Sequence, residues 1–481
     1  MIKKNRIEFE TDTGTEYVFL TDSCLVFEKS QINSEDETIK HRINMINHTC
    51  QSFANSLSYK NNISNIQTLK EDLYRNGFKE LILEVTTSCN LRCKYCIFSG
   101  NYTGQRQHGN RNMDEIIALK AIKMYFNYYL ESKKYNPNNR PSIAFFGGEP
   151  LLNMPLIKKC LAYINSIFSK QDNVYLTITT NATLLNNEII NFFKKQNVHV
   201  VVSLDGPKEI HDANRIFPKG EGTFNTVMKN IHNIYSINNK PVFINSVYDY
   251  NTNLEKVFNF FDENQILMNL GISPVRDNNG SYYKKFSENT RQKFIERKFN
   301  LEKTFQDKIL KKREETIKYN FLPFVGQFFG REYSIILMKQ VLQYRDGCIK
   351  FTGSCIPGQK IFVDTEGTLY PCEKVDRDFI IGNVKDGLNF SYILETIKEF
   401  NDFFIECKDC PIHNVCQLCY CYLRKNGKFF KDKQLCNNII DIFINRLSKT
   451  YSALEKDPFW FRFFLDKYYG EFKKWEVLKK C

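Results

Sequence analysis

The distribution of cysteines constrains this chain more than any other feature of its sequence. The 481 residues contain 16 cysteines, of which three fall within Cys89–Cys96 and nine within Cys348–Cys436. The first residues lead into no apolar signal region, and thiols inside cells are kept reduced, so a disulfide scaffold is not expected. Random burial would not group the cysteines in this way. The grouping predicts that metal organises parts of the fold.

Composition and charge exclude several classes of protein. With 42% hydrophobic and 25% charged residues, the chain is neither disordered nor collagen-like. No run of about twenty apolar residues is available to cross a bilayer, so we expect a soluble, cytoplasmic protein without a membrane partner. The net charge of +13 favours an acidic partner such as an acidic peptide. A clustered basic face is missing from the sequence, so nucleic acid is not the expected partner.

Six apolar runs alternate with amphipathic helices in the middle of the chain, which is the pattern of βα units around a parallel sheet. These runs are Leu81–Val85, Ile143–Phe146, Tyr175–Thr179, Val198–Leu204, Val242–Val247 and Ile266–Ile272. Eight such strands close a full barrel, so six predict an α/β fold with a partial (β/α)6 TIM-like barrel. The open side of such a barrel admits a large substrate.

The segments that flank the barrel differ from it in pattern. Residues 1–77 begin with alternating strands and continue with helices. Residues 276–345 predict helices that bridge two domains. Residues 346–440 have little apolar content and predict a core organised around metal, and residues 441–481 predict a helical tail. With the barrel at 78–275, these segments give five expected regions.

The first cysteine group has the spacing Cys89-x3-Cys93-x2-Cys96 and follows the first predicted strand, where active-site loops of parallel sheets emerge. Three thiolates occupy three corners of a four-iron cluster and leave one iron open. An open coordination position is how a metal centre binds a substrate or cofactor. The alternative from spacing alone is a structural zinc site with a distant fourth ligand.

Further motifs favour the iron cluster. The cysteine group is followed by Gly147-Gly148-Glu149-Pro150, by Thr180-Asn-Ala-Thr-Leu-Leu185 and by Ser203-Leu-Asp-Gly-Pro207, with His211, Asp212 and Arg215 beyond them. In this combination the chain resembles the radical S-adenosylmethionine (radical SAM) enzymes. The resemblance implies that the open iron chelates the amino and carboxylate groups of SAM. It also implies that one electron cleaves the sulfonium to give a 5′-deoxyadenosyl radical.

The resemblance assigns eight residues to SAM: Gly147, Gly148, Glu149 and Pro150 to the amino group, Tyr95 to the adenine, Asn181 and Ser203 to the ribose or methionyl end, and Arg215 to the methionyl carboxylate. Glycines suit this role because a backbone without side chains approaches a ligand closely, and a carboxylate pairs with an ammonium. The structural alternatives are a strand-end turn at the glycines, and loop capping or solvation for the polar side chains.

The later cysteines follow the pattern Cys355-x11-Gly-x4-Cys372 and then Cys407-x2-Cys410-x5-Cys416. This pattern resembles the SPASM extension of peptide-modifying radical SAM enzymes, whose cysteines hold two auxiliary clusters, so three [4Fe–4S] clusters are expected in total. The resemblance assigns the nearer cluster to Cys348, Cys355, Cys372 and Cys419, and the outer cluster to Cys407, Cys410, Cys416 and Cys436. The family spacing would place a ligand at Tyr420, so Cys421 stays open as an alternative to Cys419. A free buried thiol is the alternative for Cys348, and it would leave the nearer cluster with an open iron.

Glu373 directly follows Cys372, at the position where sulfatase-maturing members of the family carry a carboxylate that acts as a base. The resemblance therefore assigns proton acceptance from the substrate to Glu373, and burial beside a cluster would perturb its pKa. The alternative is a solvated glutamate at a strand end.

Taken together, the resemblances predict an enzyme that forms thioether crosslinks between a cysteine and an acceptor carbon in a ribosomally made precursor peptide. Residues 1–77 are then expected to form a winged-helix-like module that adds the leader peptide to a sheet edge, with a plain hairpin on the barrel as the alternative. A flavodoxin or ferredoxin would donate electrons. The alternative activities are carbon–carbon crosslinking, formylglycine formation in a sulfatase, and radical modification of tRNA. An iron–sulfur electron carrier would not need the SAM residues.

Overall fold

The computed structural model describes residues 2–3, 6–21, 23–46, 63–76, 78–100, 102, 104, 106–275, 281–311, 328–329, 336, 356–407, 409–416 and 418–457. The chain divides into two compact units, each of which combines distant segments. Unit 1 comprises Met1–Leu73, Phe329–Ile356 and Phe390–Lys474, and unit 2 comprises Tyr74–Phe328, Pro357–Asn389 and Trp475–Cys481.

Unit 2 is built on a ten-stranded sheet with the order β10-β9-β8-β7-β6-β5-β11-β12-β13-β14. Its parallel core consists of β5 (Glu80–Thr86), β6 (Ser142–Gly147), β7 (Tyr175–Thr180), β8 (Val198–Ser203), β9 (Val242–Tyr248) and β10 (Leu267–Pro274). These six strands are the six predicted from the sequence. Among the described residues the sheet ends at β10 and at β14, so the expected α/β fold with an incomplete parallel barrel is confirmed.

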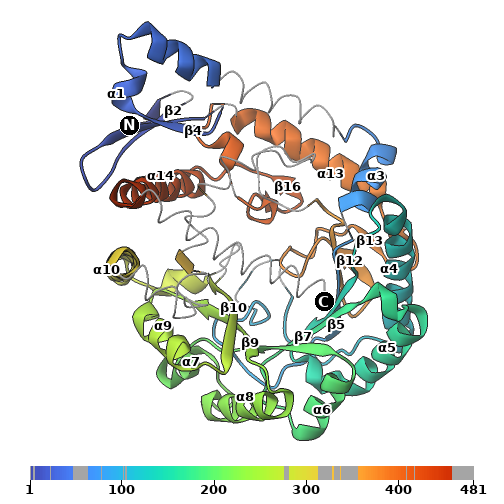
Figure 1. The fold of residues 1–481 in the computed structure, drawn as a ribbon. Coiled ribbons are helices and arrows are strands. Elements are labelled where there is room, and N and C mark those ends of the chain that lie inside the picture. Colours follow the sequence, from blue (N-terminus) through green and yellow to red (C-terminus); the bar gives the residue numbers. More distant parts are fainter. Residues whose placement is uncertain are drawn as a thin grey trace. The chain divides into compact units, whose positions relative to one another are not determined.

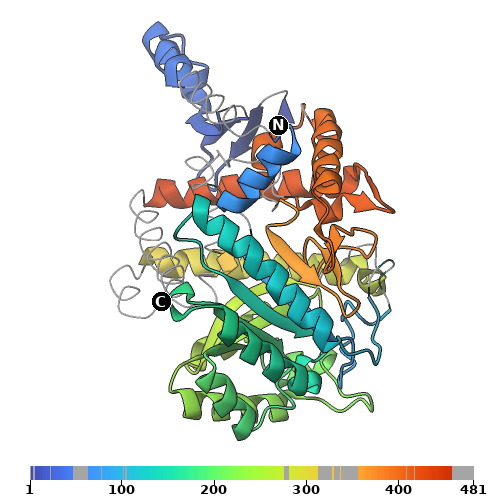
Figure 2. The same cartoon turned by 90° about the vertical axis from the view of Figure 1, so that its right-hand side faces the viewer.

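Helices alternate with the parallel strands and cover one side of the sheet. They are α4 (Glu115–Tyr135), α5 (Met154–Ile167), α6 (Asn187–Lys195), α7 (Lys208–Asn214), α8 (Phe224–Asn238) and α9 (Leu254–Glu263), followed by α10 (Glu288–Lys311). In Figure 1, α4 to α9 form an arc outside the strands β5 to β10. Figure 2 shows the long teal helix α4 lying along the near side of the sheet that it covers. This arrangement leaves the carboxyl ends of the strands for loops, where ligands bind in such folds.

Local sequence explains where these elements start and which face they bury. Along β6 and β7, buried and half-buried side chains alternate, as expected for strands with one packed face. Asp114 begins α4 because its side chain accepts a hydrogen bond from the Ile116 amide at 2.8 Å. Within α4, the fully buried Tyr125 hydroxyl donates to the Phe78 carbonyl at 2.9 Å and accepts from the Ser142 amide at 3.0 Å. The helix is thereby fixed against the first two parallel strands.

Four further strands extend the sheet beyond β5, and the sequence did not predict this pairing. They are β11 (Lys360–Val363), β12 (Thr368–Tyr370), β13 (Gly382–Asn383) and β14 (Gly387–Leu388). Strand β11 runs parallel to β5, with Phe362 opposite Ile82, and β12 to β14 continue as antiparallel neighbours. The apolar run Ile361-Phe362-Val363 is fully buried. It therefore packs in the barrel sheet rather than around a separate metal core.

Unit 1 contains a four-stranded antiparallel sheet and several helices. The strands β1 (Ile2–Lys3), β2 (Arg6–Glu10), β3 (Glu16–Leu20) and β4 (Leu25–Glu28) pair in sequence order. They are followed by α1 (Lys29–Ile32), by helical residues 37–46 and by α3 (Ile66–Asn76), which ends in unit 2. The later elements are α13 (Phe390–Phe403), the 3-10 turns η5 (Phe404–Cys407), η6 (His413–Val415) and η7 (Tyr420–Tyr422), the short strands β15 (Arg424–Lys425) and β16 (Lys428–Phe429), and α14 (Lys433–Lys456).

The N-terminal sheet shares its core with the C-terminal helix of unit 1. The Phe19 ring lies 5.2 Å from Phe443 of α14, edge to face, and Phe9 lies 5.6 Å from Tyr451. Ile412 and Val415, from the cysteine-rich segment, are buried in the same core. The expected order of strands and then helices in residues 1–77 is present, and these strands are stabilised by residues more than 400 positions later. In the part of the chain that the structure describes, no helix is both long and apolar enough to span a bilayer.

Candidate active site and iron–sulfur cluster sites

The first cysteine group lies in the loop after β5, at the carboxyl end of the parallel strands. The Leu91 amide donates to Cys89 Sγ at 3.4 Å, and the Phe98 amide donates to Cys96 Sγ at 3.4 Å. Burial raises the pKa of Cys89 to about 11 and that of Cys96 to about 12, and repulsion from the Cys93 thiolate adds to both. Three thiols that repel one another's ionised forms need a cation to hold them as thiolates.

The first cysteine group supplies three thiols that could serve as cluster ligands. Among the described residues, no three His, Cys, Asp or Glu side chains are close enough together to hold a single metal ion. A zinc ion needs all its ligands within about 2.0–2.3 Å of one point. In an iron–sulfur cluster each thiolate binds a different iron, so the sulfurs stand further apart. The donor set of three thiols with amides directed at them therefore suits iron and sulfide.

Gly147 and Gly148 bring the end of β6 against the backbone that leads into the cysteine loop. The Gly148 amide donates to the Thr86 carbonyl at 3.0 Å, and the Glu149 amide donates to the Ser88 carbonyl at 2.8 Å. A Cβ at Gly147 would lie 2.3 Å from the Thr86 oxygen, and one at Gly148 would lie 2.2 Å from the Ser88 oxygen. The lack of side chains at Gly147 and Gly148 therefore allows the end of β6 to pack against the backbone of Thr86 and Ser88.

Glu149 is fully buried, and its carboxylate is held by three protein donors. It accepts hydrogen bonds from Thr180 Oγ1 at 2.7 Å, from the Asn181 amide at 2.8 Å and from the Leu151 amide at 3.1 Å. Burial raises the pKa of Glu149 to about 7. The side chain joins the ends of β6 and β7 and caps the 3-10 turn η2 (Pro150–Asn153), which begins at the buried Pro150.

Asn181 connects the loop after β7 to the cysteine loop. Its side-chain amide donates to Asn90 Oδ1 at 2.9 Å and lies 4.0 Å from Cys89 Sγ. Asn90 in turn donates to Thr183 Oγ1 at 2.8 Å. Ser203 is the last residue of β8 and is half-buried. Two of the polar residues assigned to SAM thus stand at successive strand ends, and one of them contacts the cysteine loop directly.

Arg215 contacts the half-buried Tyr95 and the buried Asp205. Arg215 Nε donates to Asp205 Oδ2 at 3.0 Å, and the Tyr95 hydroxyl donates to the same oxygen at 2.5 Å. The Arg215 guanidinium lies 5.4 Å from the centre of the Tyr95 ring. Burial raises the pKa of Cys93, and Arg215 opposes this shift. Arg215 therefore stabilises a thiolate beside it, and Asp205 orients it.

His211 supports the loop that contains Asp205 through both of its ring nitrogens. It is fully buried, its Nδ1 accepts from the Asp205 amide at 3.3 Å, and its Nε2 lies 2.9 Å from Thr223 Oγ1. Asp212 accepts from the Thr223 and Phe224 amides, both at 2.8 Å, and so fixes the start of α8. His211 and Asp212 act on the fold of the loop that carries Arg215.

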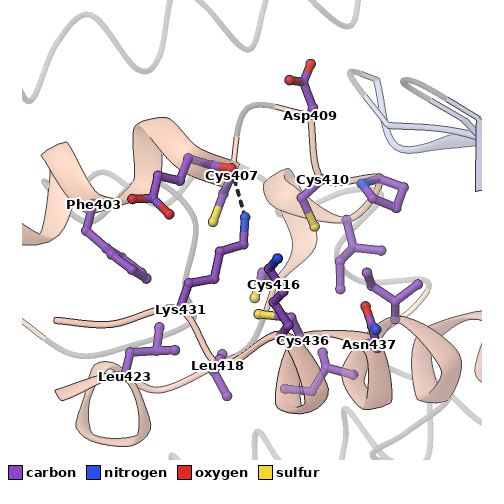
Figure 3. A pocket seen from close by; sticks show the side chains of 16 residues that line it. Phe403, Cys407, Asp409, Cys410, Cys416, Leu418, Leu423, Lys431, Cys436 and Asn437 are labelled. Atoms are coloured by element: carbon purple, nitrogen blue, oxygen red, sulfur yellow. Dashed lines mark hydrogen bonds between the residues drawn. The ribbon is translucent and has the colours of Figure 1, made fainter. Parts of the chain in front are cut away.

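Four cysteines of unit 1 line one cavity of about 300 Å³: Cys407, Cys410, Cys416 and Cys436. They come from η5, from the loop after it, from the end of η6 and from the first turn of α14. Figure 3 shows their sulfur atoms directed toward the same space, with Lys431 beside them. Burial raises the pKa of Cys407 to about 11, and the Lys431 ammonium opposes this shift. The structure brings together the four residues assigned to the outer cluster.

Of the four residues assigned to the nearer cluster, the structure describes two, Cys372 and Cys419. Cys348 and Cys355 lie outside the described residues, Cys372 belongs to unit 2, and Cys419 belongs to unit 1. Cys372 follows β12 and accepts from the Lys374 amide at 3.4 Å. Tyr420, at the position where the family spacing expects a ligand, is buried and packs edge to face on Phe400 with ring centres 6.1 Å apart.

Glu373 lies next to Cys372 in a positively charged environment. Its Oε1 is 3.7 Å from Lys374 Nζ, and Oε2 is buried without a hydrogen-bond partner among the described residues. Burial favours the protonated acid, but Lys374, Lys360 and Arg106 outweigh it and lower the pKa of Glu373. The carboxylate is therefore ionised at neutral pH, as a proton acceptor must be.

Two family models match the chain. The model of the radical SAM superfamily matches residues 83–263, and the model of the SPASM iron-sulfur cluster-binding domain matches residues 355–420. The chain is a radical SAM enzyme with a SPASM domain. Its radical SAM domain contains the first cysteine group and the strand ends described above, and the match implies SAM and iron–sulfur clusters as cofactors.

Relatives of this radical SAM enzyme include a cysteine-type anaerobic sulfatase-maturating enzyme of Clostridium novyi, which is 27% identical over 78% of this chain and 96% of its own length. The radical SAM cyclopropyl synthase TigE of Paramaledivibacter caminithermalis is 25% identical over 81% of this chain and 76% of its own. The solved structure of anSMEcpe with bound AdoMet and Cp18Cys peptide has a TM-score of 0.57 and 22% identity, covering 80% of this chain and 98% of that one. The last similarity is one of fold.

Sequence reasoning missed several residues of the radical SAM site. Asp205 lies in the Ser203-Leu-Asp-Gly-Pro207 motif, but the motif does not indicate its role, and no pattern marks Asn90 between Cys89 and Cys93. Each is recognisable only by its partner: Asp205 by Arg215, which follows α7 in the same segment, and Asn90 by Asn181, which follows β7. Arg106, which is buried and carries charge, had no signal in the sequence at all.

Proposed function

We propose that this enzyme uses SAM to oxidise a cysteine-containing peptide and forms a thioether crosslink in it. The observation that carries the proposal is the grouping of Cys89, Cys93 and Cys96 at the carboxyl end of an open parallel barrel, where three thiols supply an incomplete set of ligands for a four-iron cluster. Three thiolates leave one iron available for a ligand. A relative named as a cysteine-type anaerobic sulfatase-maturating enzyme, and a structural neighbour solved with a bound Cp18Cys peptide, support a peptide substrate.

Different residues of unit 2 would bind the cofactors and accept the substrate proton. Cys89, Cys93 and Cys96 would hold the first cluster. The eight residues assigned to SAM would orient the SAM molecule at the strand ends. Bound SAM and the clusters would supply hydrogen abstraction and take up the surplus electron. Glu373, ionised in its basic surroundings, would accept the proton of the substrate thiol. Loss of one hydrogen atom, one proton and one electron makes the crosslink a two-electron oxidation.

The auxiliary clusters would use the later cysteines. The cavity formed by Cys407, Cys410, Cys416 and Cys436 supplies four thiols for the outer cluster. Cys348, Cys355, Cys372 and Cys419, with Cys421 as an alternative, are proposed for the nearer cluster. The proposal thus includes three [4Fe–4S] clusters in a cytoplasmic enzyme, with a flavodoxin or ferredoxin as electron donor.

The precursor peptide would reach the enzyme through its leader. The antiparallel sheet β1 to β4 has outer strands at both sides, and an extended leader can add to such an edge by backbone hydrogen bonds. The domain limits proposed here remain 1–77 for this module, 78–275 for the barrel, 276–345 for the helical bridge, 346–440 for the SPASM domain and 441–481 for the tail.

A second candidate is formylglycine formation on a sulfatase. It is favoured by the identity to the cysteine-type sulfatase-maturating enzyme of C. novyi, which extends over 96% of that protein. The two candidates share hydrogen abstraction and proton acceptance and differ in the fate of sulfur. A thioether retains the cysteine sulfur, whereas formylglycine formation removes it.

Anaerobic reconstitution followed by product analysis tests the proposal. We expect about twelve irons per chain, and release of 5′-deoxyadenosine after addition of SAM and reductant. The triple variant of Cys89, Cys93 and Cys96 to alanine should lose about four irons and all SAM cleavage, while Cys160→Ala, a buried cysteine outside both groups, should keep both. Continued SAM cleavage by the triple variant would overturn the active-site assignment. Mass spectrometry of a co-expressed Cys-rich peptide then distinguishes loss of two hydrogens with sulfur retained from loss of sulfur.

A further inference from the structure

Arg106 occupies an unusual position for a charged side chain. It is 4% exposed, and its guanidinium lies between two aromatic rings, 4.1 Å from the centre of Phe362 and 5.1 Å from that of Phe98. Phe98 follows the first cysteine group, and Phe362 belongs to β11. Contact with two ring faces fixes the plane of the guanidinium, which an ammonium group would not reproduce.

The polar atoms of Arg106 connect two segments of unit 2. Its Nη2 donates to the backbone carbonyl of Glu373, and its Nε faces Glu84 Oε1 at 3.7 Å. Glu84 is fully buried on β5, and neither of its carboxylate oxygens accepts a hydrogen bond of ordinary length from a described residue. Burial raises the pKa of Glu84 to about 7, and the charge of Arg106 opposes this shift.

A second contact joins the same segments. The Arg377 amide donates to the Gly104 carbonyl at 3.1 Å, so the loop after the first cysteine group meets the turn after Cys372 at two points. Buried ion pairs add little net stability compared with apolar packing of the same volume, and their attested use is to fix one arrangement over others. Here the arrangement that is fixed is that of the Cys372–Glu373 turn on the loop of the first cluster.

We propose that Arg106, held by Glu84, is a positioning residue that sets the orientation of the Cys372–Glu373 turn toward the active site. This inference rests on the proposed function, since it concerns a proposed cluster ligand and a proposed base. Arg106 acts through the Glu373 backbone and contacts no reacting atom. Its loss should move the turn and leave the first cysteine group in place.

Hydrogen exchange on the reconstituted enzyme tests the positioning role. The reporter is the Arg377 amide, which is bonded to Gly104. In Arg106→Lys, and in the isosteric Glu84→Gln, we expect this amide to exchange about tenfold faster, while amides of β7 and β8 keep their rates. The matched control is Arg111→Met, because Arg111 pairs with Glu366 at the surface of the same unit, with both side chains more than half exposed. It should leave the Arg377 amide unchanged.

A spectroscopic measurement separates positioning from general stability. In a background without Cys89, Cys93 and Cys96, only the SPASM clusters would give an EPR signal after reduction. Adding Arg106→Lys should change that signal, and adding Arg111→Met should not. The inference would be overturned if the Arg377 amide exchanged at the wild-type rate in both Arg106→Lys and Glu84→Gln. It would also be overturned if amides throughout unit 2 exchanged faster by the same factor. If the variant without Cys89, Cys93 and Cys96 binds no iron, the SPASM clusters of the proposed function are absent and that proposal fails. The hydrogen-exchange measurement then decides the role of Arg106 by itself.

Discussion

Replacement of Gly148 by alanine is the sharpest test of how the active site is built. The added Cβ would meet the Ser88 oxygen at 2.2 Å, the Ser88 carbonyl carbon at 2.6 Å and the Thr87 oxygen at 3.0 Å. All three atoms are backbone, so no side chain can rotate away. Ser88 is also bonded to the Glu149 amide at 2.8 Å, which prevents the two segments from separating without loss of that bond.

The expected cost follows from these contacts. Forcing a methyl group into a packed site typically costs about 1–3 kcal/mol. For a domain of this size class each kcal/mol lowers Tm by about 2–4 °C. Because Ser88 precedes Cys89, the strain should also displace the first cysteine ligand. We therefore expect Gly148→Ala to melt several degrees lower and to bind less iron at the first cluster.

The matched control is Gly271→Ala in β10, where an added Cβ meets no atom within 4 Å. Differential scanning calorimetry and iron analysis of the two anaerobic proteins provide the comparison. Equal melting temperatures, together with equal iron content and equal SAM binding by calorimetry, would refute the reasoning. The glycine would then not be needed for the approach of β6 to the cysteine loop.

Three further predictions concern other parts of the two units. Asp205→Asn removes one partner of a buried pair with Arg215, whose side chains are 3% and 11% exposed, and should cost about 3–5 kcal/mol in denaturant unfolding. Glu209→Gln, in a surface pair more than half exposed on both sides, should cost less than about 1 kcal/mol, and similar losses for both would contradict the burial argument. Burial lowers the pKa of His211 to about 4, below the unfolded value of 6.5, so stability should fall by up to about 3 kcal/mol between pH 6.5 and pH 4. His211→Gln should flatten that part of the pH profile measured by thermal melting, and an unchanged slope would refute the assignment. Cys410→Ala should lower iron content by about four atoms and leave SAM cleavage without peptide intact, and an unchanged iron content would exclude the cavity as a cluster site.

The parallel barrel was predictable because its signal is local. Each strand is a short apolar run between amphipathic helices, and six such runs appear in the structure as β5 to β10. The extension through β11 was not predictable in this way. Ile361-Phe362-Val363 is too short to indicate its partner, and its parallel pairing with β5 joins residues about 280 positions apart. Such a pairing depends on the folded sheet edge that is available, not on the run itself.

The sequence indicates the positions of the site residues, but it does not show why those residue types are needed there. The sequence marks Gly147-Gly148-Glu149, but only the structure reveals that the glycines admit the backbone of Thr86 and Ser88 and that the carboxylate is enclosed by Thr180, Asn181 and Leu151. A motif is read along the chain, whereas close approach and burial depend on neighbours from other strands. The same holds for Tyr420, which is buried in the core at the position where the spacing of the family would place a ligand.

The sequence by itself determined the class of this protein. The spacing of Cys89, Cys93 and Cys96 and the alternation of apolar runs with amphipathic helices are local patterns, so they can be recognised along the chain without knowledge of the folded structure. Tertiary structure decided which distant groups meet. It gathered Cys436 of α14 with Cys407, Cys410 and Cys416 in one cavity, and it placed Arg106 between Glu84 and Glu373. These contacts arise from packing and from the cost of burying unpaired charge, and both depend on surroundings that exist only once the chain has folded.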